Sequence, residues 1–278
     1  MIHIKKITVW VLTMGILPLF ISTQSLAAQS DKKAKAGIKP MSIEVAQYTK
    51  RPPVNKATVA EGRRLYENAC IFCHGVEANG KGPVAYFLSR DTAPLPRDFT
   101  LGPYKFRSTE SGEPPLDEDL FRTITKGISG YMPAFVALDA DDRWKLVYYI
   151  ESLIPEDFKD VEPVPIKVVG KPVPMTAMSV QRGYLLYQKA KCWECHGGGG
   201  KGDGEKAPKL KDDLDIPAPP TNLTMPSSFK AGNRPEDLYR TILSGLDGGP
   251  MPSFQDQFEG HEQDIWDLIN YIRSLSTL

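Results

Sequence analysis

Two short stretches, ACIFCHG at residues 69–75 and KCWECHG at residues 191–197, decide the fold and the chemistry expected of this sequence. Each stretch holds two cysteines separated by two residues, and a histidine directly follows the second cysteine. Together they use all four cysteines of a 278-residue chain that has only four histidines. We therefore expect the chemistry of the chain to centre on these two places.

The sequence on the C-terminal side of each stretch repeats as well. DLFRTITKGISGYMPAF at residues 119–135 is matched by DLYRTILSGLDGGPMPSF at 237–254, and RWKLVYYIESL at 143–153 is matched by IWDLINYIRSL at 265–275. Order and spacing are both kept, which indicates an internal duplication. Two repeats of this length predict two globular domains, at residues 57–154 and 178–278. Residues 155–177 are rich in proline and predict an extended linker between them.

Each half has the same predicted helical outline, and no segment shows the strict alternation of a β-strand. Acidic residues and a proline mark the start of the middle helix, at Asp117 in the first half and at Pro235 in the second. The other expected helices are Val59–Asn68, Asp141–Leu153, Val180–Lys189 and Gln263–Leu275. The predicted fold class is therefore all-α, with two tandem domains.

The N-terminus has the pattern of an export signal. A short basic start precedes a largely apolar run, residues 7–21, and small residues follow at 25–28. We predict a signal peptide at residues 1–28 and a flexible leader at 29–56, which places the rest of the chain outside the cytoplasmic membrane, in the periplasm or otherwise exported. An uncleaved signal would make it a membrane anchor. The formal net charge of zero gives no support for nucleic-acid binding.

The two five-residue motifs match the attachment pattern of c-type haem. In that pattern two thiols bond to one edge of the porphyrin, and the adjacent imidazole becomes an axial iron ligand. The motif residues are Cys70, Cys73 and His74 in the first half, and Cys192, Cys195 and His196 in the second. Three alternatives compete: one zinc site shared by all four thiolates, a thioredoxin-like redox pair, and plain disulfides. None of them explains why each cysteine pair is followed by a histidine.

Each half also offers a sixth iron ligand. Met132 and Met251 stand at matching places in the repeat, each followed by a proline in the loop before the last helix. A thioether is a soft, neutral ligand that suits ferrous iron. Methionine more often fills gaps in a core, which is the competing interpretation here. His261 lies outside the motifs and is expected to be a solvated residue, or else a ligand that replaces Met251.

These residues resemble the dihaem class I cytochromes c, most closely the cytochrome c4 type of two fused domains. The resemblance implies two covalently bound haems c, with His74 and Met132 on one iron and His196 and Met251 on the other. It also implies a glycine on the first helix that lets the last helix approach, at Gly62 and Gly183. A proline carbonyl that orients the histidine is implied too, and the candidates are Pro94, Pro96, Pro217, Pro219 and Pro220. Residues expected near the haem propionates are Lys105, Arg107 and Lys230.

Two complete pairs of axial ligands predict a carrier of single electrons between a donor and an acceptor protein. It is expected to act either as a free soluble protein or as the electron-transfer subunit of a respiratory oxidoreductase in the membrane or the periplasm. Methionine ligation raises the reduction potential of haem. The alternative is a dihaem cytochrome c peroxidase-like enzyme. That activity requires one iron with an available face.

Overall fold

The computed structural model describes residues 51–87, 94–101 and 104–276. The predicted signal peptide and residues 29–50 of the predicted leader lie outside this part. The described residues belong to one compact unit, Gln47–Leu278. They contain no β-strand, and extended segments pair only through isolated bridges, so the all-α prediction is confirmed. None of the helices in the described part is long and apolar enough to cross a bilayer.

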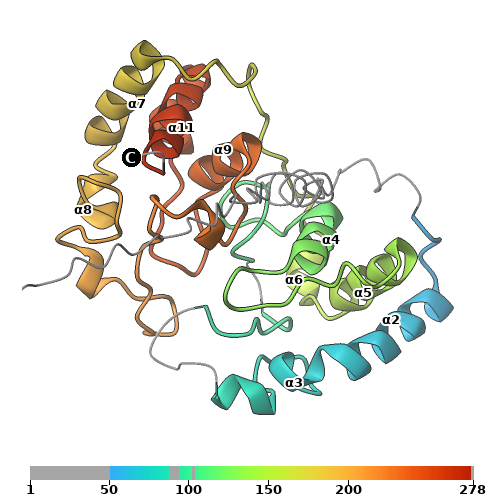
Figure 1. Cartoon of the computed structure of the whole chain (residues 1–278). Coiled ribbons are helices and arrows are strands. Elements are labelled where there is room, and N and C mark those ends of the chain that lie inside the picture. The colour runs from blue at the N-terminus through green and yellow to red at the C-terminus, as the bar shows by residue number, and fades with distance from the viewer. Residues whose placement is uncertain (1–50, 88–93, 102–103, 277–278) are drawn as a thin grey trace, which may run out of the picture. The chain divides into compact units, whose positions relative to one another are not determined.

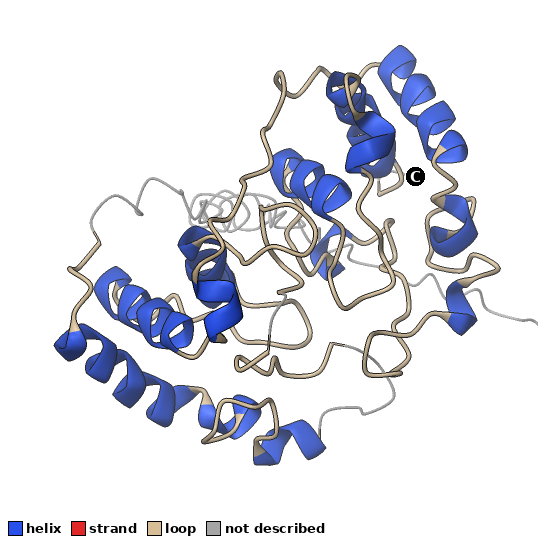
Figure 2. Cartoon of the chain, turned by 180° about the vertical axis from the view of Figure 1, so that it is seen from behind, coloured by secondary structure: helices blue, strands red, loops and turns tan. Residues whose placement is uncertain are grey.

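Both halves contain a long first helix, a one-turn helix, a 3-10 helix, a middle helix and a last helix, and the second half has further short helices (Figure 1). The first half holds α2 (Lys56–Ala69), α3 (Ile71–His74), the 3-10 helix η2 (Pro83–Tyr86), α4 (Asp117–Lys126) and α5 (Ala140–Ser152). The second holds α7 (Ala177–Lys189), α8 (Trp193–His196), η3 (Ala207–Lys209), η4 (Pro226–Ser228), α9 (Pro235–Ser244), α10 (Gln255–Phe258), η5 (Glu262–Asp264) and α11 (Ile265–Ser274). Long loops connect the helices, as Figure 2 shows.

Local sequence explains where these helices begin. The Asn55 side chain caps α2 by accepting hydrogen bonds from the backbone N–H groups of Ala57 at 2.9 Å and Thr58 at 3.1 Å. Pro235 opens α9 at a position where a missing N–H costs nothing. The structure thus fixes the last residues of the predicted leader, because Asn55 is part of the first helix cap.

The first and last helices of each half cross at a glycine, as the resemblance implied. α2 packs against α5, and α7 packs against α11. A Cβ atom at Gly62 would lie 1.9 Å from the carbonyl oxygen of Lys145, and one at Gly183 would lie 2.0 Å from that of Asp267. Any side chain at either position would therefore separate the two helices.

Each half has its own hydrophobic core, centred on a tryptophan of its last helix. Trp144 is fully buried and stacks on Phe121 with 4.4 Å between ring centroids. Trp266 is buried in the same way and lies 4.7 Å from the ring of Tyr239. The duplication seen in the sequence is thus a duplication of cores.

The segment between the halves is neither wholly extended nor free. A short helix, α6 (Glu156–Lys159), follows Pro155, so the prediction of an extended linker is wrong there. Proline is tolerated at the start of a helix, because the N–H that it lacks would have no partner within the helix there. Further along, the N–H of Ile166 donates to the Ser108 carbonyl, and the Val169 carbonyl accepts the Trp266 indole N–H at 2.8 Å. The segment is therefore held by both halves.

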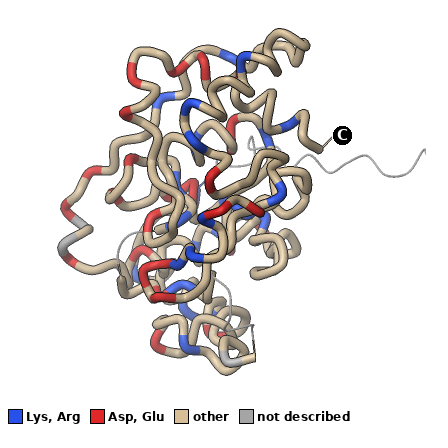
Figure 3. The backbone as a smooth tube through the Cα atoms, turned by 90° about the vertical axis from the view of Figure 1, so that its left-hand side faces the viewer, with Lys and Arg blue, Asp and Glu red and all other residues tan. Residues whose placement is uncertain are grey.

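Polar contacts also join the two halves within the compact unit. The Arg107 side chain is fully buried, pairs with Asp247 at 2.8 Å and donates to the Ser244 carbonyl at 3.0 Å. Asp247 accepts two further hydrogen bonds, from the Ser111 hydroxyl and the Gly112 N–H. Elsewhere charges of both signs are interspersed along the chain (Figure 3). A buried ion pair with extra hydrogen bonds of this kind fixes a geometry, because losing one partner would leave a buried charge uncompensated.

Candidate functional site

Both CxxCH motifs lie on a single helical turn that follows the first helix of each half. The backbone N–H of His74 donates to the Cys70 carbonyl at 2.9 Å, and that of His196 donates to the Cys192 carbonyl at the same distance. Residues four apart on a helix share a face. The first cysteine and the histidine of each motif are therefore presented on the same side, where one would attach the haem and the other would hold its iron.

A backbone carbonyl orients each histidine ring. Nδ1 of His74 lies 2.9 Å from the Arg97 oxygen, and Nδ1 of His196 lies 3.0 Å from the Thr221 oxygen. Because a carbonyl can only accept, Nδ1 carries the proton in both rings and the lone pair of Nε2 remains for a metal. Burial lowers the pKa of both imidazoles, which favours the neutral, ligating form.

The expectation that a proline carbonyl performs this task is wrong. The accepting carbonyls belong to Arg97 and Thr221, which directly follow Pro96 and Pro220. Every residue has a carbonyl, so no side chain identifies the one that will accept. The repeated proline before it was the only sequence signal.

A tyrosine of the first helix holds the turn after each motif, and the sequence alone did not single out this role. The Tyr66 hydroxyl donates to the Gly75 carbonyl at 2.7 Å, and the Tyr187 hydroxyl donates to the Gly197 carbonyl at 2.7 Å. Both tyrosines are fully buried. The hydrogen bonds tie each motif to its first helix. Each tyrosine stands four residues after the glycine of its helix, Gly62 or Gly183, and this shared spacing is the signal that could have found them.

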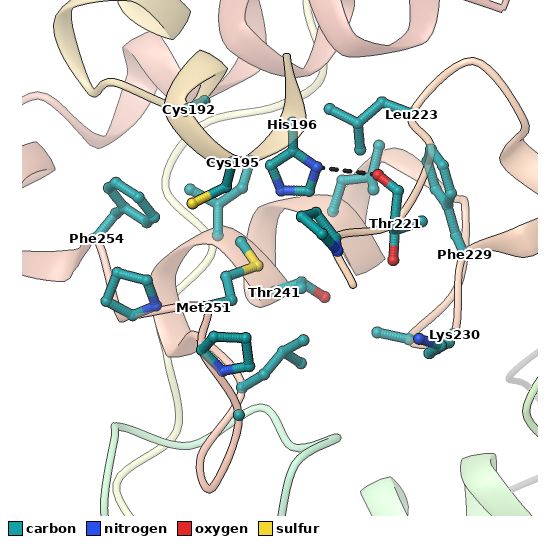
Figure 4. Close-up of a pocket in the computed structure, with 18 of the residues that line it drawn as sticks. Cys192, Cys195, His196, Thr221, Leu223, Phe229, Lys230, Thr241, Met251 and Phe254 are labelled. Atoms are coloured by element: carbon teal, nitrogen blue, oxygen red, sulfur yellow. Dashed lines mark hydrogen bonds between the residues drawn. The ribbon is translucent and has the colours of Figure 1, made fainter. Parts of the chain in front are cut away.

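A cavity of about 510 Å³ opens beside the second motif. Cys192, Cys195, His196 and Met251 all line it, and Figure 4 shows His196 and Met251 together in it. The volume lies within the range of about 300–1000 Å³ that is usual for cofactor sites. Two thiols, an imidazole whose Nδ1 is engaged and whose Nε2 carries no proton, and a thioether are the donor set that a c-type haem needs. The residues therefore fit the group.

The methionine loops are built alike in the two halves. The N–H of Ile128 donates to the Met132 carbonyl, and the N–H of Leu246 donates to the Met251 carbonyl, both at 2.9 Å. In the first half Met132 packs against the same core cluster as Cys70. The two candidate methionines thus occupy corresponding places in structure as well as in sequence.

His261 and Arg107 are not brought to the cavity. His261 is exposed and absent from the cavity lining, whereas Met251 is part of that lining, so replacement of Met251 by His261 is not supported. Arg107 is committed to Asp247 and likewise lies outside the lining. Lys105 and Lys230 do line the cavity, as expected.

The competing uses of the cysteines do not fit the geometry. In the described part of the chain, no three or more His, Cys, Asp or Glu side chains gather closely enough to hold a metal ion, which rules out a shared four-thiolate zinc site there. None of the four cysteines is paired in a disulfide. Burial raises the pKa of Cys70 and of Cys192 to about 11, the opposite of what a redox-active thiol requires.

Comparison with known proteins supports this site. Residues 57–150 match the family described as "Cytochrome C oxidase, cbb3-type, subunit III", and residues 180–276 match the family described as "Cytochrome c". The structure is similar to a chain of the reducing HAO-like protein complex of Kuenenia stuttgartiensis, with 39% sequence identity and a TM-score of 0.70. That match covers 80% of this chain and 97% of the other. A search of curated proteins found no match.

Proposed function

The chain belongs to the cytochrome c family and has two tandem cytochrome c-type domains, and from this premise we propose that it binds one haem c covalently in each half and passes single electrons between redox proteins. The observation that carries the proposal is the meeting of Cys192, Cys195, His196 and Met251 in one cavity. The first half repeats the motif, the histidine orientation and the methionine loop.

Haem c, when bound, supplies an iron that changes between the ferric and ferrous states by one electron. The chain's own residues determine how that happens. The Arg97 and Thr221 carbonyls hold each imidazole with Nε2 free. The methionine thioethers, soft and neutral, favour the ferrous state. The cavity is lined largely by apolar side chains, and such surroundings would further disfavour extra charge on the oxidised centre.

We propose that the chain acts as the electron-transfer subunit of a larger redox complex outside the cytoplasmic membrane. The similar chain of Kuenenia stuttgartiensis belongs to a reducing HAO-like protein complex, and the match extends over almost all of that chain. The export-like N-terminus, residues 1–28, fits the location. Its donor and acceptor are then proteins and not small substrates.

A peroxidase-like enzyme is the second candidate, and the site favours it less. Such chemistry needs an open iron face with acid–base groups beside it. In the second half Met251 lines the cavity and would supply the second axial ligand to a bound haem, whereas His261 is exposed outside that lining.

The test is made on the mature protein purified from the periplasm. Its intact mass should exceed that of the polypeptide by two haem masses, and its oxidation by hydrogen peroxide should be slow and show no saturation with peroxide. A mass equal to the bare polypeptide would contradict haem binding. Rapid peroxide turnover with a reduced cytochrome donor would instead establish the enzyme.

A further inference from the structure

The loop that carries Met251 is held from outside, by residues of the first half. Asp247 lies in this loop, which closes where the N–H of Leu246 donates to the Met251 carbonyl at 2.9 Å. The Asp247 carboxylate pairs with Arg107 at 2.8 Å and accepts hydrogen bonds from the Ser111 hydroxyl at 2.8 Å and the Gly112 N–H at 2.7 Å. Its three partners all belong to the first half.

Arg107 is a fixed anchor for this loop. Its side chain is 0% exposed, and that of Asp247 is 9% exposed. Besides Asp247, the guanidinium donates to the carbonyls of Tyr104 at 3.1 Å, Glu110 at 3.0 Å and Ser244 at 3.0 Å. Ser244 is the last residue of α9, directly before the loop. A buried pair with so many hydrogen bonds permits one geometry, because any displacement would leave a buried charge uncompensated.

The methionine loop of the first half lacks this pair. Ser129 stands where the repeat places Asp247, and it is exposed and has no carboxylate. The loop of Met132 is met by the second half in another way, since the Lys230 ammonium lies 4.9 Å from the ring centroid of Tyr131. The buried ion pair is therefore specific to the loop of Met251.

The loop connects this ion pair with the cavity. Leu246, Gly249 and Pro250 line the cavity together with Met251, whereas Arg107 and Asp247 lie outside the lining. The pair can therefore affect a cofactor in the cavity only through the position of the loop. A thioether suits ferrous iron better than ferric iron, so its bond to ferric iron depends more on how firmly the loop is held.

We propose that the Arg107–Asp247 pair positions Met251 as an iron ligand, so that the first half controls how firmly the haem of the second half is ligated. Arg107 is then a positioning residue that acts across the two halves. The inference rests on the proposed function, because it requires haem in the second half.

The experiment is a titration of the full mature dihaem protein, in the ferric state, with imidazole, which competes with methionine for the iron. Loss of the far-red sulfur–iron band follows the competition at both haems, and Met251→Ala assigns the second-half step, because only the first-half band remains in that variant. Arg107→Gln should tighten imidazole binding at the second-half step by about tenfold, since a loosened loop leaves the iron open for a larger fraction of the time. Ser111→Ala should tighten the same step by roughly threefold, because one hydrogen bond to Asp247 is lost. The first-half step should stay as in the wild type.

Arg182→Gln is the matched control. It removes another arginine–aspartate pair, with Asp267, that lies within the second half and outside the cavity lining. Its second-half step should equal that of the wild type.

An unchanged second-half step in both Arg107→Gln and Ser111→Ala would overturn the inference, as would an equal gain in Arg182→Gln or a gain confined to the first-half step. If Arg107→Gln does not fold, Ser111→Ala alone decides, because Ser111 is exposed. Each of these results would leave the electron-transfer proposal intact, since both haems are present. Absence of haem from the wild-type protein would instead overturn the proposed function.

Discussion

The two halves share the backbone carbonyl contact that orients each histidine, and they differ in the side chain that packs beside each histidine ring. The distance from histidine Nδ1 to the carbonyl oxygen is 2.9 Å in one half and 3.0 Å in the other. Yet Phe99 stacks on the His74 ring at 4.5 Å, whereas Leu223 takes the corresponding place in the second half. The comparison teaches that duplication preserved the parts that build a haem site, while the parts that tune it diverged.

The tryptophans at the two core centres differ as well. The Trp266 indole N–H donates to the Val169 carbonyl of the connecting segment. The Trp144 indole N–H is buried and has no hydrogen-bond partner among the described residues, and the Arg51 guanidinium lies 4.3 Å from its ring centroid. The connecting segment therefore supports the second core, and the residues before α2 support the first.

The largest expected effect tests the shared helix crossing. Gly62→Val and Gly183→Val should each disrupt their own half, at a cost of roughly 3 kcal/mol or more, because the new side chain meets a backbone carbonyl. Thermal unfolding followed by near-ultraviolet circular dichroism measures this. Gly198→Val is the control, since nothing lies within 4 Å of a Cβ at Gly198. If one half tolerated valine and the other did not, the helix crossings at Gly62 and Gly183 would not be equivalent.

The tyrosine hydrogen bonds should contribute equally in the two halves. Tyr66→Phe and Tyr187→Phe each leave a buried glycine carbonyl without its donor, so each should lower the free energy of unfolding by about 1–2 kcal/mol. Denaturant titration of the holoprotein checks both. A marked difference between the two variants would show that only one hydroxyl supports its motif.

A pH dependence should distinguish the halves. Burial, and then the hydrogen bond with Asp117, raise the pKa of Glu151 to about 9, while the corresponding residue of the second half is Arg273. The folded state thus holds a proton that the unfolded carboxyl releases near its ordinary value, about 4.3. Glu151 therefore lowers the stability of the first half as the pH rises from about 4 toward 9.

The change Glu151→Gln should remove this dependence and raise stability at pH 8 by roughly 1–2 kcal/mol, while leaving stability at pH 4 almost unchanged. Unfolding at both pH values measures the effect, and Glu156→Gln, on α6, serves as the control. An unchanged pH profile would mean that Glu151 titrates normally.

The smallest expected effect concerns the two tryptophans. Trp266→Phe should cost about 1 kcal/mol more than Trp144→Phe, because only Trp266 loses a hydrogen bond. Parallel denaturant titrations compare the two. Equal losses would show that the connecting segment does not stabilise the second core.

Local pattern predicted the helices and the motifs well, because both depend on short spacings. The observed α2 and α7 extend the predicted helices by only a few residues. The short α6 was missed because a proline-rich stretch hides a single helical turn. The contacts of Lys105 with Asp212 and of Arg107 with Asp247 join residues more than a hundred positions apart, and no local spacing encodes such pairs. The sequence therefore predicted the motif residues and Met251. It did not predict that Pro94, Lys105 and Phe106 of the first half would line the cavity of the second half.

Carbon monoxide binding to the reduced protein tests most directly the claim that each half has a complete pair of axial ligands. The wild-type protein should bind none, Met132→Ala and Met251→Ala should bind one molecule each, and the double variant should bind two. Titration followed by the visible spectrum counts the molecules bound. Binding by the wild-type protein, or no gain in either single variant, would contradict the account.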